Sequence, residues 1–144
     1  TGTTVNNFIV YDLETGGFDL KSHGIVEIAL VAIDHISLVV VDEYCKIIQP
    51  YNMASGKLAE YTSGAQDIHG VSVERMRSEG LPAETVVRDI IAFFTKHKIK
   101  SKKPIIAGHN IHKVDNPRVE AFLATFGQKL SQLTDVEDSI ETLK

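Results

Sequence analysis

The chain has 144 residues, of which 43% are hydrophobic and 24% charged, and this predicts a single domain spanning residues 1–144. No apolar run approaches the roughly 20 residues of a membrane helix, and the first residues lack the features of a signal peptide. Cys45 is the only cysteine, which excludes an internal disulfide and favours a reducing, cytoplasmic location without membrane contact. The net charge of −4 argues against a general nucleic-acid coat protein but allows an enzyme whose carboxylates hold metal ions.

Three apolar segments near the start of the chain predict strands. They are residues 8–11, residues 25–33 and a bent third strand made of residues 36–41 and 44–48. Because they follow one another closely, they favour an antiparallel meander. The polar, glycine-containing segment 50–80 is expected to form short helical turns at most.

Two helices and a fourth strand are predicted in the second half of the chain. The first helix opens after Pro82 and carries an apolar stripe at helical spacing, and residues 104–107 form the strand. The second helix is expected to begin with Asn116 as N-cap and Pro117 at the first helical position, and to end at Gly127. This order of elements predicts a mixed α/β sheet flanked by helices.

Two carboxylates stand at the end of the first predicted strand. Asp12 and Glu14 are two residues apart, so their side chains share one face of the strand, and Gly16 and Gly17 follow where the chain must turn. Alone, the pair is compatible with two solvated acids, and Asp115 with an acid that supports the dipole of the next helix. Their coincidence at the ends of two strands favours one shared functional site.

Three segments carry a resemblance to a known family. Residues 8–33, FIVYDLETGGFDLKSHGIVEIALVAI, resemble the first motif of the DnaQ-like (DEDD-type, DEDDh) exonucleases. Residues 68–72 are similar to the stretch between the first and second motifs, and residues 108–122 resemble the second motif. The asparagine-to-aspartate spacing in this motif is one residue longer than in the proofreading subunits and closer to bacterial exonuclease I.

The resemblance implies a ribonuclease H-like fold and a metal-dependent 3′→5′ exonuclease that hydrolyses phosphodiester bonds at 3′ ends of single-stranded DNA or RNA. It further implies two divalent ions, Mg²⁺ or Mn²⁺, and a role in DNA replication or repair, as a proofreading domain with a DNA polymerase or as a free-standing nuclease. Asp12 would bridge both metals, Glu14 would bind one and contact the 3′ terminus, and Asp115 would hold the other. The terminal nucleotide would be bordered by Leu13, Thr15, Gly16, Gly17, His69 and Asn110.

The third motif of this family has no counterpart in the chain. It places a histidine, the general base, a few residues before a fourth acid, but His112 is the last histidine here. Asp135, Glu137 and Asp138 therefore have no matching histidine, and residues 135–144 have helical propensity with little apolar stripe. We expect a C-terminally incomplete domain that is impaired or inactive as a nuclease and self-associates through an uncovered face of its sheet.

Other readings stay open at this point. The main alternative is a noncatalytic nucleic-acid-binding or interaction module that retains the exonuclease fold. A glycosidase with paired carboxylates is disfavoured because the chain has no tryptophan for a sugar platform. His109 and His112 supply too few ligands for zinc, and the lysines between positions 96 and 103 indicate a solvated helix end rather than a nucleic-acid surface.

Overall fold

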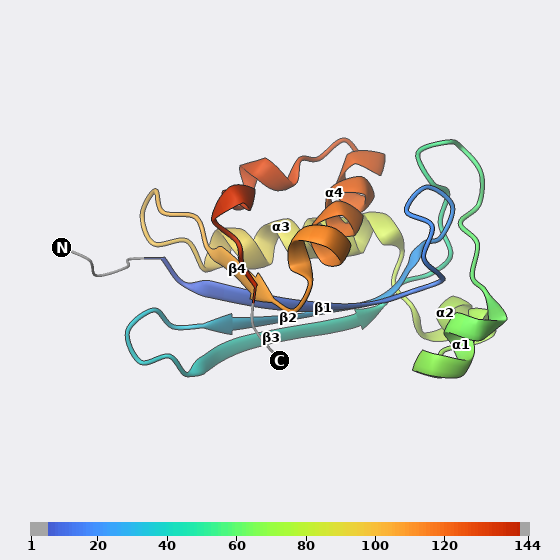
Figure 1. Ribbon diagram of the computed structural model, residues 1–144, viewed down its shortest axis with the longest axis horizontal. Helices are drawn as coiled ribbons and strands as arrows, with labels where there is room; N and C mark the ends of the chain where they lie inside the picture. The colour runs from blue at the N-terminus through green and yellow to red at the C-terminus, as the bar shows by residue number, and fades with distance from the viewer. Residues whose placement is uncertain (1–5, 142–144) are drawn as a thin grey trace.

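The computed structural model describes residues 6–141 (Figure 1). Within this range, no helix has the length and apolarity that crossing a bilayer requires. The elements in chain order are β1 (Phe8–Thr15), β2 (Ile25–Ile33), β3 (Val40–Ile47), α1 (Ser63–His69), α2 (Val73–Glu79), α3 (Ala83–Lys96), β4 (Ile105–Gly108), the π-helical turn η1 (Ile111–Asp115), α4 (Asn116–Thr125), the 3-10 turns η2 (Leu130–Gln132) and η3 (Val136–Asp138), and β5 (Ile140–Glu141).

The strands form one five-stranded sheet in the order β3-β2-β1-β4-β5. β1, β2 and β3 pair antiparallel, as a meander does, whereas β4 runs parallel to β1 and β5 parallel to β4. The predicted mixed α/β sheet with three antiparallel strands followed by parallel ones is therefore confirmed.

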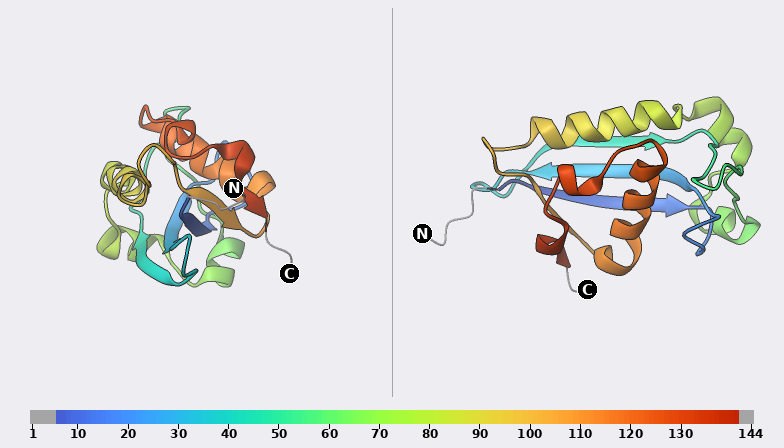
Figure 2. Two further views of the ribbon diagram at one scale, coloured as in Figure 1. Left: turned by 90° about the vertical axis from the view of Figure 1, so that its left-hand side faces the viewer. Right: turned by 90° about the horizontal axis from the view of Figure 1, so that it is seen from above.

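The core lies between this sheet and the helices α3 and α4, which cover the same face (Figures 1 and 2). Ile9 and Tyr11 of β1 point into it and pair in register with Ala32 and Leu30 of β2. The helices contribute the buried side chains of Val86, Val87, Ile90, Phe93 and Phe94 from α3 and of Val119, Phe122 and Leu123 from α4. The apolar stripes predicted for both helices are therefore core.

The other face of the sheet is open along β1 and β2. Alternating strand residues project to opposite faces, so the residues between the buried ones lie on this side, and all are half-buried or exposed. α1 and α2 lie beyond the end at which β1 finishes (Figure 1). We call this the open face; it comprises Phe8, Val10, Asp12, Glu14, Glu27, Ala29, Val31 and Ile33.

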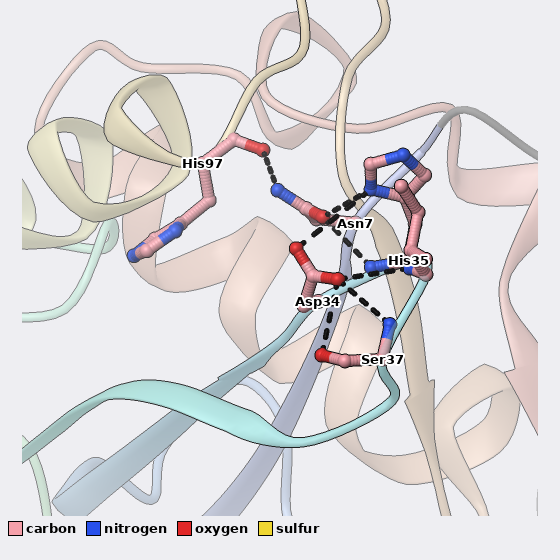
Figure 3. Close-up of polar contacts among 6 residues, drawn as sticks. Asn7, Asp34, His35, Ser37 and His97 are labelled. Carbon is pink, nitrogen blue, oxygen red and sulfur yellow. Dashed lines mark hydrogen bonds and ion pairs between the residues drawn. The ribbon is translucent and has the colours of Figure 1, made fainter.

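The Asn7 side chain connects three segments at the end of the sheet where β1 begins (Figure 3). Its side-chain oxygen accepts hydrogen bonds from the backbone N–H of His35 and lies 3.0 Å from the ring Nδ1 of that residue. Its amide nitrogen donates to the carbonyl of His97, just beyond α3, at 3.1 Å. One side chain therefore joins β1, the β2–β3 turn and the end of α3.

The β2–β3 turn corrects the predicted start of the third strand. Residues 36–39 belong to the turn, and β3 begins only at Val40. The cause is Asp34, whose carboxylate accepts from the backbone N–H groups of Ile36 and Ser37 at 2.9 Å and from the Ser37 hydroxyl at 3.1 Å. An aspartate that bonds the following backbone in this way holds a turn against strand pairing.

Segment 50–80 is more regular than predicted, because it contains α1 and α2, each seven residues long. Each helix has a capping side chain, since Thr62 accepts from the N–H of Ala65 and Ser72 from that of Arg75, both at 3.1 Å. These Thr and Ser caps were the signal in the sequence that the prediction of short turns overlooked.

Two predictions near the C-terminus are wrong. Asn116 is not an N-cap but the first residue of α4, because η1 runs directly into this helix; its buried side chain donates to the Ser139 hydroxyl at 3.2 Å. The tail is not helical in its described part, where η3 and the short strand β5 replace a helix. Without an apolar stripe, the tail gains more from backbone pairing with β4. Residues 142–144 lie outside the described residues.

Candidate active site

Asp12 and Glu14 lie on the open face near the end of β1, in register with Ala29 and Glu27 of β2. Asp12 is exposed and Glu14 is half-buried. The pKa of Glu14 is raised, first by burial and then by the charge of Asp12, while His69 opposes the shift. The register thus places both carboxylates on one face of β1, as predicted. Their negative charges repel each other.

Asp115 reaches the same region through the π-helical turn η1. The N–H of Asn116 bonds to the carbonyl of Ile111, five residues earlier, so the turn holds one residue more than an α-helical turn. This accommodates the long spacing between Asn110 and Asp115. Such turns are frequent at functional sites, and here the turn delivers a carboxylate that is only 9% exposed.

The pKa of Asp115 is raised to about 6. Burial is the largest cause and the negative charge of Asp12 the second, whereas Arg118 and His109 act in the opposite direction. Asp12 therefore acts electrostatically on both of the other carboxylates. The arrangement is two acidic pairs, Asp12 with Glu14 and Asp12 with Asp115, that share one member.

The three carboxylates do not form a single metal-binding group. Across residues 6–141, no three side chains of histidine, cysteine, aspartate or glutamate lie close enough together to hold one ion. That all three meet in one metal-sized site stays a prediction, and what the structure gives is the electrostatic effect of Asp12 on each of the other two carboxylates. The donor chemistry still fits Mg²⁺ or Mn²⁺, because such ions are commonly held by one or two carboxylates, with water and substrate phosphate completing the shell.

A cavity of about 560 Å³ opens beside Glu14. Two of its lining residues are large apolar side chains left in solvent: Phe18 is 92% exposed and Ile68 is 83% exposed. Solvated apolar side chains that rim a cavity are typical of a binding site. The lining comprises Leu13, Glu14, Thr15, Gly17, Phe18, Asp19, His23, Thr62, Gly64, Ala65, Ile68 and His69.

The two glycines after β1 are required by close contacts with neighbouring segments. A Cβ on Gly16 would lie 2.4 Å from the carbonyl oxygen of Glu60 and 2.9 Å from the Cα of Tyr61, both backbone atoms. A Cβ on Gly17 would lie 2.4 Å from the ring of His23. Only glycine lets the chain leave β1 at this point and pass so close to its neighbours.

His69, at the end of α1, lines the cavity. Its Nδ1 accepts a hydrogen bond from the backbone N–H of Val71 at 3.0 Å, so in the neutral ring Nε2 carries the hydrogen. Nε2 is buried and has no hydrogen-bond partner within the described part of the chain. It is therefore a donor left without an acceptor beside Glu14.

Most residues predicted to border a substrate lie at this cavity. Leu13, Thr15, Gly17 and His69 line it, whereas Gly16, between two lining residues, does not. Asn110 does not line it; it is exposed, in the left-handed conformation with φ 55°, where β4 passes into η1. Phe18 and Ile68 were not predicted from the sequence. The available signal was that each is a large apolar residue in an otherwise polar segment.

Solved structures resemble this fold. No model of a protein family matches the sequence, and neither does any curated protein. E. coli exonuclease I in complex with a 5cy-dA13 oligonucleotide has a TM-score of 0.76 and 17% identity, over 95% of this chain and 28% of that chain. Its complex with a dT13 oligonucleotide has a TM-score of 0.75 and 18% identity, over 94% of this chain and 27% of that chain. The zinc-bound form of the E. coli ExoI–ssDNA complex has a TM-score of 0.76 and 17% identity, over 96% of this chain and 28% of that chain.

At these identities the likeness concerns the fold, and it confirms the ribonuclease H-like architecture predicted from the sequence motifs. The chain spans little more than a quarter of the length of the exonuclease I chains that it matches.

Proposed function

We propose that this chain is a divalent-metal-dependent 3′→5′ exonuclease domain acting on single-stranded nucleic acid. The observation that carries the proposal is the position of Glu14, which lines an apolar cavity and is electrostatically coupled to Asp12, as Asp115 is. Phosphodiester hydrolysis needs concentrated negative charge to hold metal ions, and a nearby apolar surface to seat the terminal nucleotide.

In this proposal the carboxylates have separate tasks. Asp12 and Glu14 would hold one ion, Asp12 and Asp115 the other, and Mg²⁺ or Mn²⁺ fits these oxygen donors. When bound, the ions supply an activated water and stabilisation of the leaving 3′ oxygen. The burial of Asp115 favours this role, because a raised pKa marks a negative charge that its surroundings leave uncompensated.

The cavity residues would bind the end of the strand. Phe18 and Ile68 offer apolar surface on which a base can stack. His69 would border the nucleotide as part of the cavity wall. Leu13, Thr15 and Gly17 would border the nucleotide through the backbone and short side chains.

Single-stranded DNA is the first substrate to test, because the exonuclease I structures that share this fold contain such strands. The assay uses one strand labelled at its 5′ end and a second labelled at its 3′ end, each with Mn²⁺. Stepwise shortening of the first and release of a labelled mononucleotide from the second are expected. Cleavage in the middle of the strand, or shortening that survives Asp12→Asn, would contradict the proposal.

The second candidate function is a noncatalytic module that binds single-stranded nucleic acid. The observation in its favour concerns His112, whose Nε2 lies 3.1 Å from the carbonyl oxygen of Ser139, so that this ring nitrogen is engaged by the tail. A positioned general base commonly contributes about 10²-fold or more to rate. Binding of the strand by the wild-type chain without any metal-dependent shortening would favour this candidate.

A further inference from the structure

The loop between β1 and β2 carries Phe18 to the rim of the cavity. It is closed at its base by a hydrogen bond of 2.8 Å from the N–H of Gly16 to the carbonyl of Gly24. Asp19 braces its interior, accepting from the backbone N–H of Lys21 at 3.1 Å and from the Ser22 hydroxyl at 2.6 Å. These bonds shape the loop but do not fix its tip relative to the carboxylates.

Arg118 of α4 connects the tip of this loop to η1. Its Nη2 donates to the backbone carbonyl of Phe18 at 2.9 Å, and its Nη1 donates to the carbonyl of Val114 in η1 at 3.2 Å. The two residues that it joins lie far apart in the sequence. One guanidinium therefore ties the loop that carries the exposed aromatic ring to the turn that carries Asp115.

We infer that Arg118 is a positioning residue, which holds Phe18 at a fixed distance from the acidic pairs so that the terminal base of a strand stacks where its phosphate meets Asp12. The inference rests on the proposed function. With 92% of its surface in solvent, the Phe18 side chain has little packing of its own, so its place is set by its backbone. The carbonyl that Arg118 holds belongs to that backbone.

The geometry makes arginine specific for this task. A planar guanidinium presents its N–H groups in a rigid fork and can hold two carbonyls at once, whereas lysine places one flexible ammonium group. Arg118→Lys keeps the charge near Asp115 but loses the fork, and Arg118→Gln loses both. The inference predicts the same positioning defect in both variants, so charge alone does not restore function.

The first experiment measures the loop without any ligand. Hydrogen exchange of the backbone amides in residues 17–24 is compared among the wild type, Arg118→Gln, Arg118→Lys and the control Arg88→Gln. Arg88 lies on the exposed side of α3 with one long contact, 3.5 Å, to Thr85. Faster exchange in both Arg118 variants, with melting temperatures close to that of the wild type, is expected; unchanged exchange would overturn the inference.

The second experiment asks whether stacking depends on this link. Affinity for a thymidine strand is measured by fluorescence anisotropy, with either a normal or an abasic nucleotide at the 3′ end. Arg118→Gln should weaken binding of the normal strand about tenfold, the scale of one lost stacking contact, and leave binding of the abasic strand unchanged. Equal weakening on both strands would overturn the inference alone; no binding of either strand by the wild type would overturn the proposed function and the inference with it.

Discussion

Asp12 in β1 lies near enough to Asp115, at the entry to α4, for its charge to raise the pKa of the second carboxylate. The sheet explains this proximity between residues far apart in sequence. β1 and β4 are parallel neighbours, so both strands finish toward the same edge, and η1 follows β4 there. Asp12 also raises the pKa of Glu14 on its own strand, which makes it the member common to both acidic pairs.

The raised pKa of Asp115 predicts a pH-dependent gain in stability for Asp115→Asn. The folded-state pKa of about 6 lies above the ordinary value of 3.8, so above pH 6 the fold carries an unfavourable charge that asparagine lacks. We expect the variant to be more stable by about 1–2 kcal/mol at neutral pH, allowing for solvent screening. The advantage should fade as the pH falls from about 6 toward 3.8.

Denaturant unfolding at several pH values measures this difference. Asp138→Asn is the charge-matched control, because Asp138 is an exposed acid in η3. An equal effect of the two substitutions, or a difference that does not change with pH, would show that Asp115 is not an uncompensated buried charge.

Gly16→Ala should be strongly destabilising. The added Cβ meets backbone of Glu60 and Tyr61, which cannot rotate away as a side chain would. We expect a loss of about 1–3 kcal/mol in the free energy of unfolding, as for other overpacked sites. Gly64→Ala is the control on the same cavity, since nothing lies within 4 Å of its added Cβ and alanine favours a helix. Similar thermal stability of the two variants would refute the argument from close contacts.

Asn7→Ala should loosen the far end of the sheet without affecting the carboxylates. The substitution removes the acceptor of the His35 N–H and the donor to the His97 carbonyl (Figure 3), with an expected cost of about 1–3 kcal/mol. Chemical unfolding compares it with Asn52→Ala, a change at an exposed position. If both substitutions lower the free energy of unfolding equally, the hydrogen bonds of Asn7 do not stabilise this end of the sheet.

Much of the fold follows from local patterns in the sequence. The apolar run at residues 25–33 and the stripe that includes Ile90 and Phe94 predict β2 and α3 because each has a strong period and one buried face. The carboxylate pair follows from strand alternation alone. The tail was misjudged because helical propensity is a weak local preference, and β5 depends on an edge of β4 that only the folded sheet provides.

The parts of the site that could not be predicted from the sequence depend on tertiary contacts. Phe18 and Ile68 meet at the cavity only after the β1–β2 loop and α1 pack together, and neither position has a period that singles it out. Arg118 becomes informative only through its bond to the carbonyl of Phe18. Asn110 was carried over from a family resemblance, and it lies outside the cavity lining, in the left-handed conformation just before η1.

The open face predicts self-association of the chain. Phe8, Val10, Val31 and Ile33 leave apolar surface half-exposed on a sheet, and such surfaces associate when they are contiguous. Sedimentation equilibrium should show mass rising with concentration, and Val31→Lys should shift the equilibrium to monomer. Leu58→Lys, at a position 56% exposed outside this face, should leave it unchanged. A wild-type chain that stays monomeric at every concentration would contradict the prediction.

Calorimetric titration of the chain with Mn²⁺ tests the central claim most directly, because it needs neither substrate nor turnover. The wild type should bind weakly, and the affinity should rise with pH through about 6 as Asp115 ionises. Asp12→Asn removes the carboxylate shared by both acidic pairs and should abolish the binding, whereas Asp138→Asn should keep it. Equal affinity for Mn²⁺ in the wild type and in Asp12→Asn would contradict the account.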